Sequence, residues 1–335
     1  MLSQILLLFS ALVATPSWTL VDSGVDSSIR GISAVDAQVC WIGTRSGVAV
    51  TTDGGERWRF TKIGGDELDF RDLHAFDAQR CIAMSAGEGD ASRIYRSVDG
   101  GRTWELVFQN TEAKGFFNGI AFKDDQNGLL AGDPVGGRLF LLATSDAGES
   151  WQRIAEETAP QMVEGEHAFA ASGTHLSVSK DGRAWVTSGG ARARVFRSED
   201  FGASWTSQRT PMIAGESSTG IFSIAFRGQH GVAVGGDYQK ESEGRDNAMF
   251  SRDGGVGWQL ITQAGGAAPF EFRSCVGFVS ASVLVSVGPS GTDLSRDAGA
   301  SWQTLAGEPG FHTLSIAGRT VWAAGSDGRV AYLKL

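Results

Sequence analysis

One eight-residue pattern recurs six times along this chain of 335 residues. It reads Ser or Thr, any residue, Asp, any residue, Gly, any two residues and Trp, and successive copies begin 44 to 54 residues apart. The aspartates of the six copies are Asp53, Asp99, Asp146, Asp200, Asp253 and Asp297. Six full matches at near-constant spacing indicate that one structural unit repeats along the chain.

The residue types of this pattern are typical of a β-hairpin turn. An Asp side chain accepts hydrogen bonds from backbone N–H groups of the turn, and the Ser or Thr hydroxyl joins the same network. Gly supplies the positive φ that a tight turn requires, and Trp begins the returning strand and packs against the hairpin. We therefore interpret the six aspartates as structural. The alternative is that they form six carbohydrate or calcium sites.

Each unit carries four short predicted strands, which is typical of a β-propeller blade. The first strand of each blade is expected at residues 29–35, 70–76, 116–122, 168–172, 221–226 and 272–278. A seventh unit, residues 311–333, has three strands and no Asp turn. Residues 18–22 can supply its missing outer strand, which would remove an open sheet edge. The sequence thus predicts an all-β fold in which residues 18–335 form a single seven-bladed propeller closed by an N-terminal strand.

The first 17 residues are predicted to be a signal peptide. Residues 2–14 form an apolar run too short to span a bilayer, and small residues follow it, as at a signal-peptidase site. Export to the periplasm or the extracellular space follows from this interpretation, and a buried first strand or an uncleaved tail is the alternative. The three cysteines, Cys40, Cys81 and Cys275, have neither disulfide nor metal-pair spacing, so we expect buried free thiols.

Charge and motifs exclude several functional classes. The net charge is −9, from 29 basic and 38 acidic residues, which disfavours a nucleic-acid partner because phosphate binding needs a cationic face. The five histidines are scattered without zinc-ligand spacing, and the chain has no phosphate-binding loop. The sequence therefore predicts no cofactor and no metal.

Several segments outside the Asp pattern resemble one family of propellers. They are residues 119–122 (GIAF), 127–134 (NGLLAGDP), 165–173 (GEHAFAASG), 220–226 (GIFSIAF) and 230–238 (HGVAVGGDY). The chain resembles the photosystem II stability/assembly factor family and its non-photosynthetic bacterial relatives, within the sialidase-type (BNR, Asp-box) propeller superfamily. The resemblance implies a non-catalytic factor that escorts membrane-protein subunits. We expect a monomer that is at most peripheral to the membrane. Because many activities share the Asp box, it identifies the fold better than the function.

The candidate binding face is the channel mouth, where loops between second and third strands meet the chain entering each first strand. The candidate residues there are Arg30, Arg71, Glu88, Asp133, Glu166, Asp237, Tyr238, Arg273 and His312. Arginines at such a face can grip carboxylates or carbonyls of a polypeptide, which makes protein binding the first hypothesis. Internal Arg–Asp pairing inside the channel is the structural alternative. The charged insertion at residues 239–247 is expected to lie over the same face.

Two other functions remain open at the sequence level. Two acids at suitable separation could hydrolyse a glycosidic bond, although acids after glycines more often shape turns. A sialidase needs an arginine triad and a Tyr nucleophile with a Glu partner. Tyr95 and Tyr332 fall on predicted third strands away from the mouth, and no Phe/Tyr-Arg-Ile-Pro element occurs near the start. The enzyme alternative is therefore a glycosidase acting through acids at the mouth. A sugar-binding module without turnover is the third hypothesis.

Overall fold

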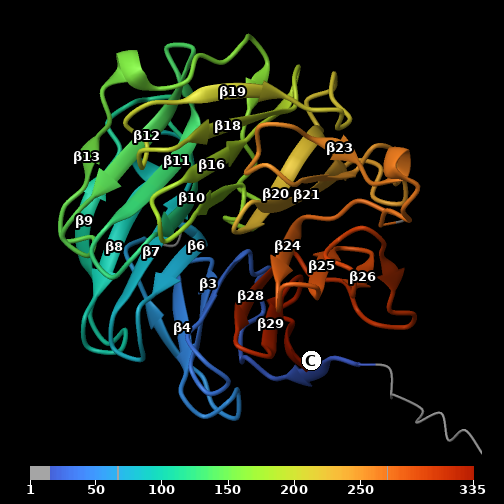
Figure 1. Cartoon of the computed structure of the whole chain (residues 1–335). Coiled ribbons are helices and arrows are strands. Elements are labelled where there is room, and N and C mark those ends of the chain that lie inside the picture. The colour runs from blue at the N-terminus through green and yellow to red at the C-terminus, as the bar shows by residue number, and fades with distance from the viewer. Residues whose placement is uncertain (1–15, 66–67, 270) are drawn as a thin grey trace, which may run out of the picture.

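The computed structural model describes residues 16–65, 68–269 and 271–335. Their strands form seven antiparallel sheets arranged as a ring, in which the first blade lies beside the last (Figure 1). Six sheets have four strands, and the sheet of the fifth blade carries two extra short strands. The predicted all-β, seven-bladed propeller is confirmed.

Every blade has the same order from the channel outward. The innermost strands are β2 (Gly31–Ala34), β6 (Asp69–Ala75), β10 (Phe117–Phe122), β15 (Leu176–Val178), β20 (Thr219–Arg227), β24 (Cys275–Phe278) and β28 (Thr313–Ala317). The second strands are β3 (Cys40–Thr44), β7 (Cys81–Ala86), β11 (Gly128–Val135), β16 (Ala184–Thr187), β21 (His230–Asp237), β25 (Leu284–Gly288) and β29 (Thr320–Ala324). The third strands are β4 (Gly47–Thr51), β8 (Arg93–Ser97), β12 (Arg138–Thr144), β18 (Arg194–Ser198), β22 (Ala248–Ser251), β26 (Gly291–Ser295) and β30 (Val330–Lys334). The outer strands are β5 (Arg59–Lys62), β9 (Glu105–Gln109), β13 (Gln152–Arg153), β19 (Thr206–Arg209), β23 (Gln259–Leu260), β27 (Gln303–Thr304) and β1 (Thr19–Val21).

The remaining elements are short and lie in connections. Two-residue strands β14 (Glu166–His167) and β17 (Gly189–Gly190) pair with each other and extend the sheet of the fifth blade. The 3-10 helices are η1 (Gly89–Ala91), η2 (Glu156–Thr158) and η3 (Thr262–Ala264). In the part of the chain that is described, no helix is long and apolar enough to cross a membrane.

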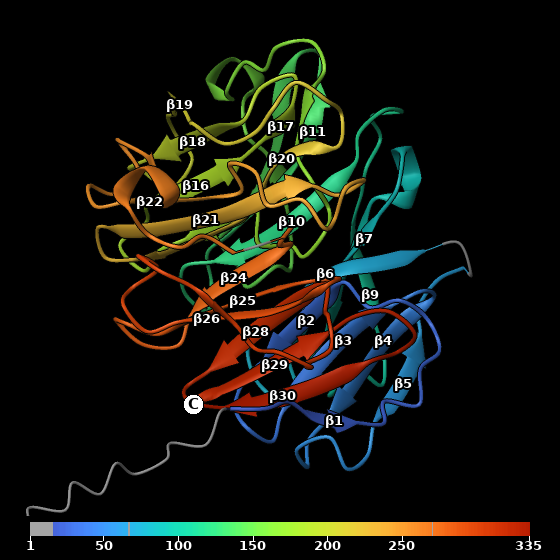
Figure 2. The same cartoon turned by 90° about the vertical axis from the view of Figure 1, so that its right-hand side faces the viewer.

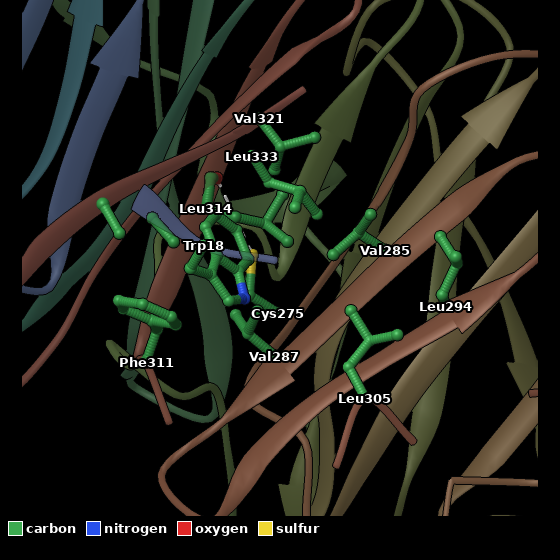
Figure 3. Packing of buried hydrophobic residues seen from close by; sticks show 12 residues of the cluster. Trp18, Cys275, Val285, Val287, Leu294, Leu305, Phe311, Leu314, Val321 and Leu333 are labelled. Atoms are coloured by element: carbon green, nitrogen blue, oxygen red, sulfur yellow. Dashed lines mark hydrogen bonds between the residues drawn. The ribbon is translucent and has the colours of Figure 1, made fainter. Parts of the chain in front are cut away.

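The N-terminal strand closes the ring as predicted. β1 pairs antiparallel with β30, with Leu20 opposite Ala331, and completes the last blade (Figure 2). Trp18, which precedes β1, packs against the ring of Phe311 at a centroid distance of 4.8 Å and donates a hydrogen bond from Nε1 to Thr292 Oγ1. Figure 3 shows this indole among the buried apolar side chains of blades six and seven. The ring is therefore closed by the pairing of β1 with β30 and by the burial of Trp18 in the core.

The predicted first strand of blade four is wrong. Residues 168–172 form no strand, and the inner strand of this blade is β15, which begins at Leu176. This blade belongs to the longest spacing between Asp turns, 54 residues, so extra chain separates the predicted strand from the observed one. We call residues 168–174 the plug segment, because they cross the channel between two cavities.

The six aspartates accept hydrogen bonds within their own turns. In the second copy, Asp99 Oδ1 accepts from the N–H groups of Arg102 and Thr103 at 2.9 and 3.0 Å, and the Ser97 hydroxyl accepts from Gly101 N–H at 2.9 Å. All six copies keep the hydroxyl-to-aspartate and glycine-to-hydroxyl bonds. The hydrogen bond from Thr103 N–H is the largest cause that lowers the pKa of Asp99. These carboxylates are thus occupied in holding their own turns.

The turn tryptophans also connect neighbouring blades. Trp104 of blade two meets Trp41 of blade one edge-on at 6.1 Å, and Trp58 of blade one meets Trp322 of blade seven in the same way at 6.2 Å. These two Asp turns therefore stabilise the ring as well as their own hairpins.

The predicted signal peptide lies almost wholly outside the described residues, which begin at Pro16. Cys40, Cys81 and Cys275 are buried free thiols. Burial raises the pKa of all three.

Candidate binding site at the channel mouth

One pocket of about 230 Å³ lies at the end of the ring opposite the Asp turns. In an antiparallel blade, the connection between the second and third strands and the chain entering the first strand lie at the same end. The pocket is lined from these two kinds of segment, from the inner strands β6 and β20 and from the plug segment. We call it the cup; its lining includes Arg30, Arg71, His312, Phe169, Phe222, Phe272, Tyr238 and Glu241.

Two of the cup residues are directed by β-bulges. The pairing of β6 with β7 skips Arg71, and the pairing of β20 with β21 skips Phe222. A bulge leaves one residue out of the ladder and changes the direction of its side chain. Each bulged residue directly follows a buried apolar residue, Phe70 or Ile221. This local irregularity brings an arginine from blade two and a phenylalanine from blade five to the same pocket.

Four aromatic rings form one wall of the cup. Phe169 of the plug segment stacks on Phe222 at 3.8 Å with an interplanar angle of 12°, and Phe272 meets Phe222 edge-on at 4.7 Å. Tyr238 lies 6.3 and 6.1 Å from the rings of Phe169 and Phe222 and is 44% exposed. The wall is therefore apolar in depth, with one amphipathic ring at its rim.

The opposite side of the cup is cationic. Arg71 Nε pairs with Asp69 Oδ2 at 2.8 Å. Among the described residues, Arg30 has neither a hydrogen-bond nor an ion-pair partner for its guanidinium, and burial is the largest cause that lowers its pKa. His312 Nε2 lies 3.0 Å from Ser326 Oγ, and burial, helped by Arg30 and Arg329, lowers the pKa of His312 to about 4. At neutral pH the two arginines carry the positive charge and the imidazole is neutral.

The plug segment forms the floor of the cup. Phe169, Ala170 and Ala171 line the cup, whereas Ser172, Gly173 and Thr174 line a second cavity of about 390 Å³ between the inner strands. The plug segment is hydrogen-bonded to blades five and six. Thr174 Oγ1 donates to Ser223 Oγ at 2.7 Å, and Ser172 Oγ donates to the Ser274 carbonyl at 2.8 Å. The cup is therefore closed from below by the chain itself.

Two predicted site acids are bonded within the protein instead of lining the cup, and one of them, Asp133, holds the plug segment. Asp133 Oδ1 accepts hydrogen bonds from Ala168 N–H at 3.1 Å and from Asn118 Nδ2 at 2.8 Å, and burial raises the pKa of Asp133. Glu166 is 2% exposed and accepts a hydrogen bond from Arg194 Nε at 2.8 Å. The bond from Ala168 to Asp133 therefore fixes the start of the plug segment, whereas Glu166 is paired internally with Arg194.

The remaining predicted residues also divide into those that line the cup and those that lie or pair elsewhere. Arg273 is fully buried and pairs with Asp293, so internal pairing describes this arginine. Asp237 Oδ1 accepts from Gln239 N–H at 3.0 Å and shapes the turn after β21. Glu88 is exposed before η1 and is not part of the cup lining. The structure thus brings together Arg30, Arg71, Tyr238 and His312 from the nine candidates.

Sequence reasoning did not select Phe169, Phe222, Phe272 and Glu241 as site residues. Phe222 could have been found, because it follows Ile221 as Arg71 follows Phe70 and Arg30 follows Ile29. Glu241 lies in the insertion predicted to cover this face, and its carbonyl accepts a hydrogen bond from Phe272 N–H at 3.0 Å. Phe169 carries no repeat signal, since the plug segment occurs once.

Fold and site together define a seven-bladed propeller with a closed, aromatic and cationic cup at its channel mouth. No family model matches the chain. It is 24% identical over 229 residues to the photosystem II assembly lipoprotein Ycf48 of Synechococcus sp. (strain CC9902), covering 67% of this chain and 59% of that relative. The resemblance to the photosystem II stability/assembly factor family, predicted from the sequence, is confirmed.

Solved structures agree on the fold. A structure described as YCF48 bound to D1 peptide superposes with a TM-score of 0.69 at 15% identity, covering 97% of this chain and 99% of the other. YCF48 from Cyanidioschyzon merolae gives a TM-score of 0.61 at 16% identity, covering 95% and 99%. At these identities the superpositions establish the architecture, and function has to be argued from the site.

Proposed function

We propose that this protein is a non-catalytic, protein-binding propeller that assists the assembly or stability of membrane or envelope proteins. The observation that carries the proposal is the cup, where Arg30, whose guanidinium is not hydrogen-bonded to any of the described residues, lies with four aromatic rings in one pocket. Aromatic and arginine side chains around a desolvated pocket are the residues that dominate protein–protein binding energy. The relative solved with a D1 peptide supports a polypeptide partner for this fold.

The disposition of the acids favours this function over glycoside hydrolysis. A glycosidase needs two carboxyl groups facing one substrate. Asp133 instead accepts a hydrogen bond from the plug segment, Glu166 is buried against Arg194, and Asp237 fixes a turn. The proposal also includes the predicted export, since the partners it names are proteins of the cell envelope. Mass spectrometry of the N terminus of the isolated protein tests whether the predicted signal peptide has been removed.

Co-purification from native membranes tests the proposed function. The full chain should retain a protein partner at a defined ratio, and the double variant Arg30→Gln with Tyr238→Ala should lose it. The matched control, Arg57→Gln with Val256→Ala, alters exposed residues of the Asp turns at the opposite end and should retain the partner. Equal retention by both variants, or turnover of a glycan by the purified protein, would contradict the proposal.

A further inference from the structure

The charged groups of the cup balance one another. Arg71 pairs with Asp69 at 2.8 Å. The second arginine, Arg30, lies near enough to Asp69 and Glu241 for both carboxylates to act on it electrostatically. These two positive and two negative charges sum to zero, and His312 is neutral at neutral pH because burial lowers its pKa to about 4. A ligand with a net charge would therefore lack a counter-charge in a partly desolvated pocket, whereas a neutral ligand needs none.

Three polar groups of the cup have unused hydrogen-bonding capacity. Among the described residues, the Arg30 guanidinium, the Glu241 carboxylate and the Tyr238 hydroxyl have no hydrogen-bond partner. Glu241 and Tyr238 are exposed and Arg30 is only partly buried, so all three can be reached from outside. A guanidinium only donates, a carboxylate only accepts, and a phenol does both. A peptide group, which has one N–H and one C=O and no charge, matches this combination.

The depth of the cup suits an apolar side chain better than a polypeptide backbone. Phe169 stacks on Phe222, and Phe272 meets Phe222 edge-on, so this wall offers no polar atom. The floor is made in part by the small side chains of Ala170 and Ala171. A peptide group placed in the depth would lose its hydrogen bonds to water without replacing them, which is costly.

The cup is large enough for an aromatic ring. Its volume of about 230 Å³ exceeds the roughly 150 Å³ of an engineered apolar cavity that accepts benzene. Aromatic rings prefer edge-to-face and offset-stacked contacts, which the rings of this wall can provide. Because the plug segment closes the floor, a chain that carries the ring cannot pass through the channel. Its backbone therefore stays at the mouth, beside the three polar groups.

We propose that the cup binds one uncharged aromatic side chain from the interior of a partner polypeptide, with the neighbouring peptide groups of that chain on Arg30, Glu241 and Tyr238. This inference deepens the proposed function, on which it rests, by naming the feature that the partner must present. That feature is an exposed loop or extended segment with an aromatic residue. A free chain end fits less well, because it would bring a net charge to a balanced site.

Calorimetry or NMR titration of the full chain with short peptides tests the proposal. The neutral probe is a tripeptide with phenylalanine between two glycines, capped by an acetyl group and an amide, and the matched probe has alanine in the middle. The phenylalanine probe should bind at least about tenfold more tightly, because it buries a large apolar side chain. Two further probes carry either a free carboxylate or a free amine in place of one cap. Both should bind severalfold more weakly than the neutral probe.

Two single variants should shift the charge preference in opposite directions. Arg30→Gln leaves one excess negative charge, so the probe with the free amine should gain severalfold relative to the neutral probe. Glu241→Gln leaves one excess positive charge, so the probe with the free carboxylate should gain instead. Tyr238→Ala should weaken the neutral phenylalanine probe severalfold. The control Arg57→Gln, at the Asp-turn end, should change none of these affinities.

The proposal is overturned if the phenylalanine and alanine probes bind alike, if a charged probe binds the parent more tightly than the neutral one, or if no probe binds at millimolar concentration. These failures are distinguishable from failure of the proposed function. A protein partner that is lost only in the double variant of Arg30 and Tyr238, combined with equal binding of the two neutral probes, would reject the aromatic site and keep the protein-binding face. Preference for phenylalanine without any partner from native membranes would keep the site and reject the assembly role.

Discussion

Asp72 makes stability depend on pH through a single buried carboxyl group. It lies on β6, is 6% exposed, and accepts hydrogen bonds from Ile120 N–H at 2.6 Å and Leu73 N–H at 2.8 Å. Burial raises the pKa of Asp72 from 3.8 to about 7. Between these values Asp72 holds its proton in the folded protein and not in the unfolded chain, so its contribution to the free energy of unfolding falls as pH rises from about 4 to about 7.

The variant Asp72→Asn should lose this contribution, which we expect to amount to about 2–3 kcal/mol between pH 5 and pH 8. Urea unfolding at pH 5 and pH 8 measures it, and Asp26→Asn, an exposed position, is the matched control that should keep the slope of the parent. A variant at Asp72 with an unchanged slope would show that the group titrates in its ordinary range.

At the residue scale, what could be predicted was what depends on neighbours in sequence. The role of Asp99 follows from donors within four residues, so the repeat pattern was sufficient to predict it. The orientation of Arg71 depends on a bulge, which strand alternation does not reveal. The roles of Glu166 and Arg273 depend on partners 20 to 28 residues away, Arg194 and Asp293, that no local pattern identifies.

Two glycines with the same positive φ, one in an Asp turn and one in open space, allow the energetic cost of backbone strain to be separated from the cost of overpacking. Gly101 has φ +79°, and a Cβ added there would lie 2.7 Å from the Trp41 ring of the neighbouring blade. Gly137 has the same φ, but an added Cβ would have no atom within 4 Å. Gly137→Ala should therefore cost about 1 kcal/mol from the backbone alone. Gly101→Ala should cost about 2–4 kcal/mol, because overpacking is added.

Urea unfolding of both glycine variants measures the difference, which reports how tightly an Asp turn is packed on the preceding blade. Similar losses at the two positions would mean that the ring tolerates a methyl group between Gly101 and Trp41, and that the turn acts within its own hairpin only.

At the element scale, regular spacing predicted most inner strands, and departure from it marked the error. Blades with the shorter repeats have their inner strands where the sequence placed them, as β10 at Phe117–Phe122 illustrates. In blade four the apolar residues 168–172 have the composition of a strand, but they cross the channel and pack against Phe222 and Ser274. Composition predicts burial of these residues and cannot distinguish a strand from a plug.

Closure of the whole ring could be predicted by counting the repeated units and their strands. Six Asp turns and one incomplete unit require a strand from elsewhere, and the segment before Asp22 was the unassigned one. The cup was less predictable, since it combines side chains from blades one, two, five, six and seven with the plug segment. A site assembled from single residues of many blades leaves no contiguous motif.

Closure at the scale of the molecule should depend more on Trp18 than on any exposed residue of β1. The Trp18 side chain is 8% exposed in the core of blades six and seven, whereas Leu20 is 61% exposed on the same segment. Trp18→Ala should therefore lower the free energy of unfolding by about 3–5 kcal/mol, while Leu20→Ala should change it by less than about 0.5 kcal/mol. Urea unfolding of the two variants measures this difference.

Loss of the indole should also loosen β1 and so uncover the edge of β30, the strand with which β1 pairs. An uncovered, regular edge strand pairs with another chain, so size-exclusion chromatography with light scattering should detect dimers or larger species of Trp18→Ala and not of Leu20→Ala. If both variants unfold like the parent and stay monomeric, the ring is held by its blade-to-blade contacts alone and the N-terminal strand is dispensable.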